Sequence, residues 1–161
     1  MEQEKLYDIA EVPEDKSLTL EEEAKLKKLW KMFSSFNIKS YINKDSEYVE
    51  DFISWSRIKY ILMDFGYIPR VKTYLIKSPV GAGFYVKCFV TIDNITRSTE
   101  LPVYKSGSSG KIFTDNNINV WEVQNTKLRA FVRCIAENFG LGIHLYMGFQ
   151  KIYEKMPELT I

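Results

Sequence analysis

Two arginines four positions apart carry the clearest chemical signal in the sequence. Arg129 and Arg133 lie in a stretch with a helical pattern, where residues at i and i+4 project from one face. A guanidinium group is always charged and binds phosphate oxygens in a bidentate geometry. The spacing therefore predicts a grip on the phosphates of a nucleic acid. Taken alone, it fits equally well with ordinary surface residues beside a buried stripe.

An apolar stripe predicts the helix that positions these arginines. Its members recur at helical spacing and are Leu128, Phe131, Val132, Ile135 and Phe139. Gly140 is placed to end the helix in a left-handed turn, and Gly142 lets the chain turn again. We predict one long helix over residues 121–148 that ends in a glycine-rich corner.

Three strands with a period of two precede this helix. The pattern predicts strands over 70–77, 83–93 and 95–103 in an antiparallel meander. One face of the middle strand is predicted to be core, and it carries Phe84, Val86, Cys88, Val90 and Ile92. The opposite face carries Tyr85, Lys87 and Phe89, a composition that is unusual for a solvated surface. We expect this second face to contact something.

Two helices are predicted before the strands. Thr19 and Glu22 form a capping box. The stripe that follows comprises Leu26, Leu29, Trp30 and Phe33. We expect it to pack on the domain or to form an interface with a neighbouring subunit. Ser54 or Ser56 begins the second helix, and Gly66 ends it. The fold class is therefore α+β: a three-stranded meander followed by a long helix, with preceding helices.

The charge is distributed unevenly along the chain. The net charge is only +1, but residues 1–23 hold nine acids and two lysines, which leaves 20 bases and 12 acids in residues 24–161. An acidic head on a basic body is typical of nucleic-acid binders with an interaction tail. We expect residues 1–17 to form a flexible acidic leader and residues 18–161 to form a single domain. Like-charge repulsion predicts that removing the leader raises the affinity for DNA.

The residues of common catalytic and metal sites are missing from the sequence. His144 is the single histidine, in a run 143–146 predicted as a short strand, and Cys88 and Cys134 form no CxxC pair. We expect a core histidine and buried reduced thiols. Gly110-Lys111 lacks the remaining residues of a phosphate loop. We predict no catalytic residues, no metal and no cofactor.

Without a signal peptide or an apolar run long enough for a membrane span, we expect no membrane contact and a cytoplasmic protein.

Basic residues interleaved with aromatic ones remain as the candidate chemistry. They are Arg57, Lys59, Arg70, Lys72, Tyr74, Tyr85, Lys87, Phe89, Arg97, Lys127, Arg129 and Arg133. Single-stranded nucleic acid is held by a cationic groove along its phosphates, with aromatic rings that stack on its bases.

Three ordered blocks of the sequence resemble a known family. They are Tyr48-Val49-Glu50-Asp51-Phe52-Ile53-Ser54-Trp55-Ser56, the run from Thr91-Ile92-Asp93 to Glu100-Leu101-Pro102-Val103, and Arg133-Cys134 followed by Phe139-Gly140-Leu141-Gly142 and Tyr146-Met147-Gly148. Over roughly residues 32–148 the chain resembles the Sak-type phage single-strand annealing proteins, of the superfamily of Redβ, Erf and the eukaryotic strand-annealing mediator. It departs from them at Phe149-Gln150, where the family places an acidic pair, and at Gln124-Asn125-Thr126, which lacks the family's aspartate.

The resemblance implies ATP-independent annealing of complementary strands in phage homologous recombination, in the cytoplasm of a bacterial host. The partners it implies are single-stranded DNA, the annealed duplex intermediate and further copies of the chain in a ring or helical filament. A host single-strand-binding protein is a further candidate partner. The phosphate role carries over to Arg129 and Arg133 by alignment, and the remaining predicted DNA-binding residues are Lys127, Arg57, Lys87, Arg97 and Phe52. The alternative is a non-enzymatic protein-interaction module on the same fold, since fold does not imply function. An enzyme such as a nuclease ranks third.

Overall fold

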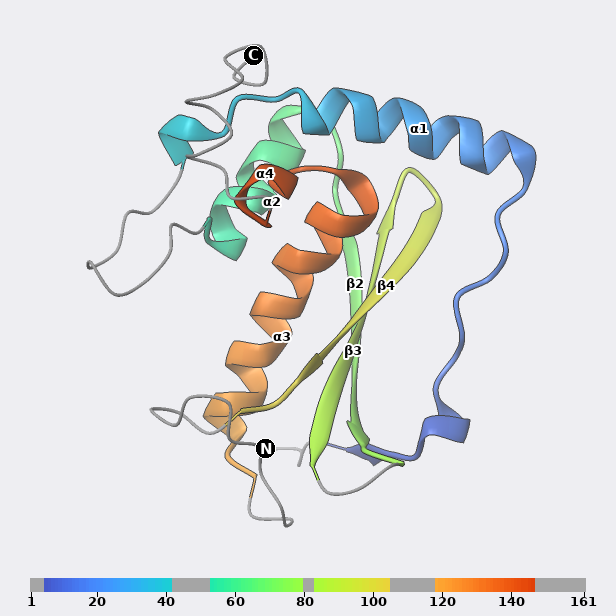
Figure 1. Ribbon diagram of the computed structural model, residues 1–161, viewed down its shortest axis with the longest axis vertical. Coiled ribbons are helices and arrows are strands. Elements are labelled where there is room, and N and C mark those ends of the chain that lie inside the picture. The colour runs from blue at the N-terminus through green and yellow to red at the C-terminus, as the bar shows by residue number, and fades with distance from the viewer. Residues whose placement is uncertain (1–4, 42–52, 80–82, 105–117, 147–161) are drawn as a thin grey trace.

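The computed structural model describes residues 5–41, 53–79, 83–104 and 118–146 (Figure 1). Its centre is a four-stranded sheet in the order β1-β2-β3-β4. The strands are β1 (Leu6–Tyr7), β2 (Arg70–Lys77), β3 (Phe84–Ile92) and β4 (Ile95–Pro102). The predicted antiparallel meander is confirmed as β2, β3 and β4. Asp93 and Asn94 form the β3–β4 turn with φ of 52° and 65°, as a two-residue hairpin requires.

The prediction of a three-stranded sheet is wrong by one strand. β1 pairs in parallel with β2, with Leu6 opposite Leu75 and Tyr7 opposite Ile76, so the sheet is mixed. The cause of the error is that two residues are too few to show a period of two. The strand is held by its pairing with β2 rather than by a pattern of its own.

The two helices before the meander begin and end close to the predicted residues. The α-helices are α1 (Leu20–Ser34), α2 (Trp55–Asp64), α3 (Val120–Cys134) and α4 (Ile143–Tyr146), with short 3-10 turns η1 (Ile9–Glu11) and η2 (Lys39–Tyr41) and a π-helical turn η3 (Ile135–Phe139). The capping box of Thr19 and Glu22 starts α1, and Ser54 caps α2. In the described part of the chain every helix falls short of the length and apolar content that a membrane crossing requires.

One face of the sheet carries the hydrophobic core. The predicted core side chains of β3 are buried there, and α1, α2 and α3 pack over them. Figure 1 shows α3 running along the sheet, while α1 crosses the end where the β3–β4 turn lies. Lys25 of α1 binds that turn through the Asp93 carbonyl oxygen at 3.0 Å and its carboxylate at 3.4 Å.

The long C-terminal helix differs from its prediction in three ways. It is α3 continued by η3, and it ends at Gly140, whose φ of 91° is the predicted left-handed turn. Residues 143–146 form a helical turn rather than a strand, and 147–148 lie outside the described residues. Leu128 is 37% exposed because the buried face of α3 lies further round the helix, and Leu128 falls beyond its edge. The buried positions there are Glu122, Val123, Thr126, Ala130, Phe131 and Cys134.

The apolar stripe of α1 is used within the chain. Leu29 and Phe33 are buried in the core, and Leu26 packs against it. Trp30 lies on Gly140, where an added Cβ atom would come within 3.0 Å of the Trp30 carbonyl oxygen and ring. Of the two expectations for this stripe, packing on the domain is the one that these contacts support.

Candidate nucleic-acid interface

The two arginines that the sequence singles out are both exposed on α3. Asn119 caps the start of this helix by accepting a hydrogen bond from the Trp121 backbone N–H at 2.7 Å. Arg129 Nη2 lies 3.4 Å from the hydroxyl of Thr126, which itself donates to the Glu122 carbonyl at 2.7 Å. Arg129 is therefore steered along the helix surface while its charge stays exposed to solvent.

Glu137 orients the second arginine. Arg133 Nε donates to Glu137 Oε2 at 3.3 Å, and the other oxygen of that carboxylate accepts from the Thr99 hydroxyl of β4. Asn138 also reaches β4, where its amide donates to the Ser98 carbonyl at 3.1 Å. An exposed i,i+4 ion pair contributes only about 0.3–0.5 kcal/mol. A phosphate group can therefore replace Glu137 at little cost, while the β4 contact keeps the carboxylate in place.

Tyr146 of α4 supplies an aromatic ring beyond the end of η3. Burial raises the pKa of the Tyr146 hydroxyl, and the positive charge of Arg133 opposes this shift. Tyr146 is still 55% exposed. The predicted DNA-binding residues did not include Tyr146, which entered only as part of a motif. We call Arg129, Arg133 and Tyr146 the arginine face.

Lys127 and the basic residues of α2 lie apart from the arginine face. Side chains two positions apart in a helix do not share a face, so Lys127 projects away from Arg129. Arg57 donates to the Tyr41 carbonyl at 2.8 Å. Lys59, left out of the predicted DNA-binding set, lies 5.4 Å from the Trp55 ring centroid and 5.8 Å from that of Phe131. This second basic and aromatic edge runs along the contact between α2 and α3.

Lys87 and Arg97 are held by the N-terminal segment. Lys87 points from the sheet face opposite α3, is 9% exposed, and donates to the Pro13 carbonyl at 3.2 Å. Arg97 pairs with the Asp15 carboxylate at 3.8 Å. Phe52 lies outside the described residues. The predicted DNA-binding residues thus fall in three places: the arginine face, the α2 edge, and the contacts with the N-terminal segment.

The cysteines and the histidine are part of the packing. Cys88 and Cys134 are buried free thiols, as predicted. Burial raises the pKa of Cys88 to about 12 and that of Cys134 to about 11. His144 is 8% exposed, and its Nε2 lies 2.7 Å from the Ser34 carbonyl oxygen, which ties α4 to α1. In the part of the chain that the structure describes, no three His, Cys, Asp or Glu side chains gather as a metal site would need.

The structure is an α+β domain in which an antiparallel meander packs on a helix with two exposed arginines four positions apart, an arrangement that suits phosphate binding. A comparison with protein-family models identifies the family to which this chain belongs. The family model of the Sak single strand annealing protein matches residues 28–159, most of the chain, and the chain belongs to this family. The resemblance seen in the sequence is thereby confirmed. Searches of curated proteins and of solved structures found no match.

Proposed function

We propose that this protein binds single-stranded DNA on the arginine face and anneals complementary strands without ATP. Membership of a single-strand annealing family points to annealing of single strands in recombination. The observation that carries the residue assignment is the exposed Arg129–Arg133 pair on α3, inside the matched region. The setting that we propose is phage homologous recombination in the cytoplasm of a bacterial host, with no catalytic step by the protein.

The chemistry needs only binding and release. Arg129 and Arg133 bind phosphate oxygens and neutralise the repulsion that two DNA strands exert on each other. Tyr146 stacks on a base without regard to its sequence. The remaining bases stay available for pairing with a complementary strand, and this base pairing supplies the free energy of annealing. No energy source beyond pairing is required.

Several copies of the chain extend the binding surface. The two arginines are four positions apart on α3, about 6 Å along the helix axis, so one copy contacts only a short piece of strand. We propose a homo-oligomer, either a ring or a helical filament. Because most of the α1 stripe packs within the chain, we propose that the interface lies elsewhere. Trp55, Tyr60 and Met63 of α2 are exposed and supply apolar surface for it.

An annealing assay tests the proposed function. Two complementary labelled oligonucleotides are mixed with the protein in the absence of nucleotide, and duplex formation is followed over time. The full chain should accelerate annealing, and Arg129→Ala/Arg133→Ala should lose most of that acceleration. Lys27→Ala/Lys28→Ala, which removes the same charge from the exposed surface of α1, is the matched control and should keep it. Failure of the full chain to bind or anneal DNA would contradict the proposal.

A protein-interaction module is the second candidate. Trp121 is 68% exposed and Val120 is 66% exposed at the start of α3, an apolar pair that a protein partner would cover. A chain that binds no single strand while a Trp121→Ala change abolishes a protein complex would favour this alternative.

A further inference from the structure

The outer face of the sheet, which is the face opposite α3, has the composition of a single-strand binding surface. Besides Glu100, which pairs with Lys87 at 3.8 Å, strand register places three cations and three aromatic rings on it. They are Arg70, Lys72, Lys87, Tyr74, Tyr85 and Phe89. Lys72 lies 5.4 Å from the Tyr74 ring centroid, and Lys87 lies 5.2 Å from that of Phe89. Cations that alternate with rings bind the phosphates and bases of a single strand.

An acidic segment of the same chain lies over this face. Residues 8–18, here called the strap, contain four acids and one lysine. Val12 anchors the strap, since it is 7% exposed and packs against Tyr74 and Ile76. Lys87 donates to the Pro13 carbonyl, and Arg97 binds both the Asp15 carboxylate at 3.8 Å and the Lys16 carbonyl at 3.4 Å. The strap thus occupies two cations with its own oxygen atoms.

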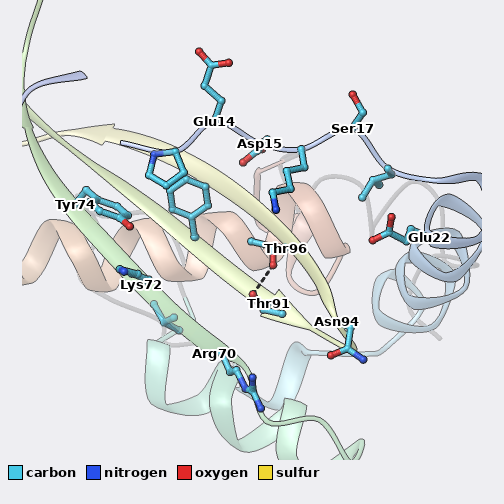
Figure 2. Close-up of a pocket in the computed structure, with 15 residues that line it drawn as sticks. Glu14, Asp15, Ser17, Glu22, Arg70, Lys72, Tyr74, Thr91, Asn94 and Thr96 are labelled. Atoms are coloured by element: carbon cyan, nitrogen blue, oxygen red, sulfur yellow. Dashed lines mark hydrogen bonds between the residues drawn. The ribbon is translucent and has the colours of Figure 1, made fainter. Parts of the chain in front are cut away.

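The strap covers the face without filling the space beneath it. A cavity of about 580 Å³ lies between them, with Pro13 to Leu18 on one side and Arg70, Lys72 and Phe89 on the other. Figure 2 shows Glu14 and Asp15 on the strap above Lys72 and Tyr74 of β2. Apart from Val12 and the partly buried Leu18, the strap is held mainly by polar contacts with Lys87 and Arg97, in which phosphate oxygens can take the place of the strap's oxygen atoms. Among the described residues, the buried Nε of Arg97 has no hydrogen-bond partner, a further cost of the closed state.

We propose that the outer face is a second binding surface for single-stranded DNA and that the strap covers it until a strand displaces the strap. The backbone carbonyls and carboxylates of the strap take the place of phosphate oxygens at Lys87 and Arg97. Displacement leaves Lys87 with Glu100, at 3.8 Å, as its remaining partner, releases Arg97 at the β4 edge, and opens the cavity beside Arg70 and Lys72. The inference extends the proposed function, because it adds a second surface for the same ligand. A single chain then contacts DNA on both sides of its sheet.

Full-length variants that loosen the strap test this proposal. Val12→Ser removes the anchor without a charge change, and Asp15→Asn removes the ion pair to Arg97. Glu23→Gln, an exposed acid of α1, is the control that changes charge equally outside the strap. Affinity for a labelled oligothymidylate is measured across a salt series. Val12→Ser/Asp15→Asn should bind about 1.5- to 5-fold more tightly than Glu23→Gln, the range expected for one exposed ion pair. Its log-affinity against log-salt slope should also steepen by about 0.7 per added phosphate contact.

The Lys72→Ala change shows whether the added affinity comes from DNA contacts on the outer face or only from the loss of a negative charge. In the loosened variant it should remove the added affinity, and in the unmodified chain it should cause a smaller loss, because the strap covers Lys72 until a strand displaces it. A second measurement needs no variant: hydrogen exchange at residues 8–18 of the unmodified chain should speed up when oligothymidylate binds. Equal affinities for the loosened variant and Glu23→Gln, together with unchanged exchange in the strap, would overturn the proposal.

The experiments distinguish a failure of the proposed arginine-face binding from a failure of the strap proposal. If Arg129→Ala/Arg133→Ala binds DNA like the parent chain while Lys72→Ala weakens the loosened variant, the arginine face is wrong and the outer face stands. If the arginine variant loses binding while Lys72→Ala has no effect in the loosened variant, the outer face is wrong and the arginine face stands. A loosened variant that binds no oligothymidylate also overturns the outer face.

Discussion

The two faces of the sheet are covered in different ways. On one face, α1, α2 and α3 bury a continuous apolar layer that includes Val86, Val90 and Ile92. On the other, Val12 anchors the strap through a small cluster with Tyr74 and Ile76, and Leu18 at the end of the strap packs against the main core. Among the described residues, the strap also forms an ion pair with Arg97 and accepts hydrogen bonds from Lys87 and Arg97.

This difference indicates which of the two sheet faces stays covered when DNA binds. Burial of apolar area stabilises by about 25 cal/mol per Å² and does not depend on a competing ligand. Exposed ion pairs contribute little, weaken in salt and are open to competition by any other anion. The helical cover therefore maintains the fold, while the strap is suited to be exchanged for the phosphates of a DNA strand.

The largest predicted effect comes from truncating a ring under the helical cover. Phe131 is 3% exposed, and Phe131→Ala should lower the free energy of unfolding by about 3–5 kcal/mol through lost burial and a cavity. Val12→Ala under the strap should cost about 1.5 kcal/mol or less, the transfer free energy of two methyl groups. Urea unfolding of both variants measures the difference. Equal losses would show that the strap is as much a part of the core as α3 is.

A pair of glycines sharpens the same comparison. Gly140 and Gly66 have nearly equal φ angles, 91° and 93°, so alanine strains the backbone by about 1–2 kcal/mol at either site. Only at Gly140 would the new Cβ meet the Trp30 carbonyl oxygen at 3.0 Å; at Gly66 no atom lies within 4 Å. Gly140→Ala should therefore cost more than Gly66→Ala by about 1–3 kcal/mol, the usual cost of overpacking. Similar unfolding midpoints would show that α1 can move away from Gly140.

A further predicted effect depends on pH and reports mainly on burial under the helical cover. Burial raises the pKa of Cys88 to about 12 and that of Cys134 to about 11, from an ordinary value of 9.0. Between pH 9 and 11 the folded state keeps these protons while the unfolded chain releases them, so the free energy of unfolding falls as pH rises. Denaturant unfolding at pH 8 and pH 10 measures the fall, which Cys88→Ala/Cys134→Ala should reduce. An equal fall in that variant would assign the pH dependence to other groups.

The fold was predictable wherever a sequence pattern extends over enough residues to define a helix, a strand or a turn. The meander, the cap at Thr19 and the left-handed turn at Gly140 follow from local sequence, because alternation, capping and a positive φ are local properties. β1 was missed because its two residues are held by pairing alone. Leu128 was misplaced because a helical stripe defines a face only to within one neighbouring position.

The types of residue in the candidate site were predictable from the sequence, but which of them lie together in space was less so. The spacing of Arg129 and Arg133 specifies a shared helix face, and the structure has both exposed there. The pair of Arg133 and Glu137 is also readable from its i,i+4 spacing, but the contact of Glu137 with Thr99 depends on how the helix crosses β4, which no spacing reveals. Lys87 and Arg97 are cations, but their contacts with residues 13–16 are tertiary, so no local pattern indicates that these cations already have partners.

The salt dependence of single-strand binding tests the central claim most directly. The log-affinity of the full chain for oligothymidylate is measured against log-salt, alongside Arg129→Ala/Arg133→Ala and the charge-matched Lys27→Ala/Lys28→Ala. If each arginine binds one phosphate, the arginine variant should lower the magnitude of the slope by about 0.7 per lost contact, and the lysine variant should leave the slope unchanged. A folded arginine variant with the slope and affinity of the parent chain would contradict the assignment of phosphate binding to α3.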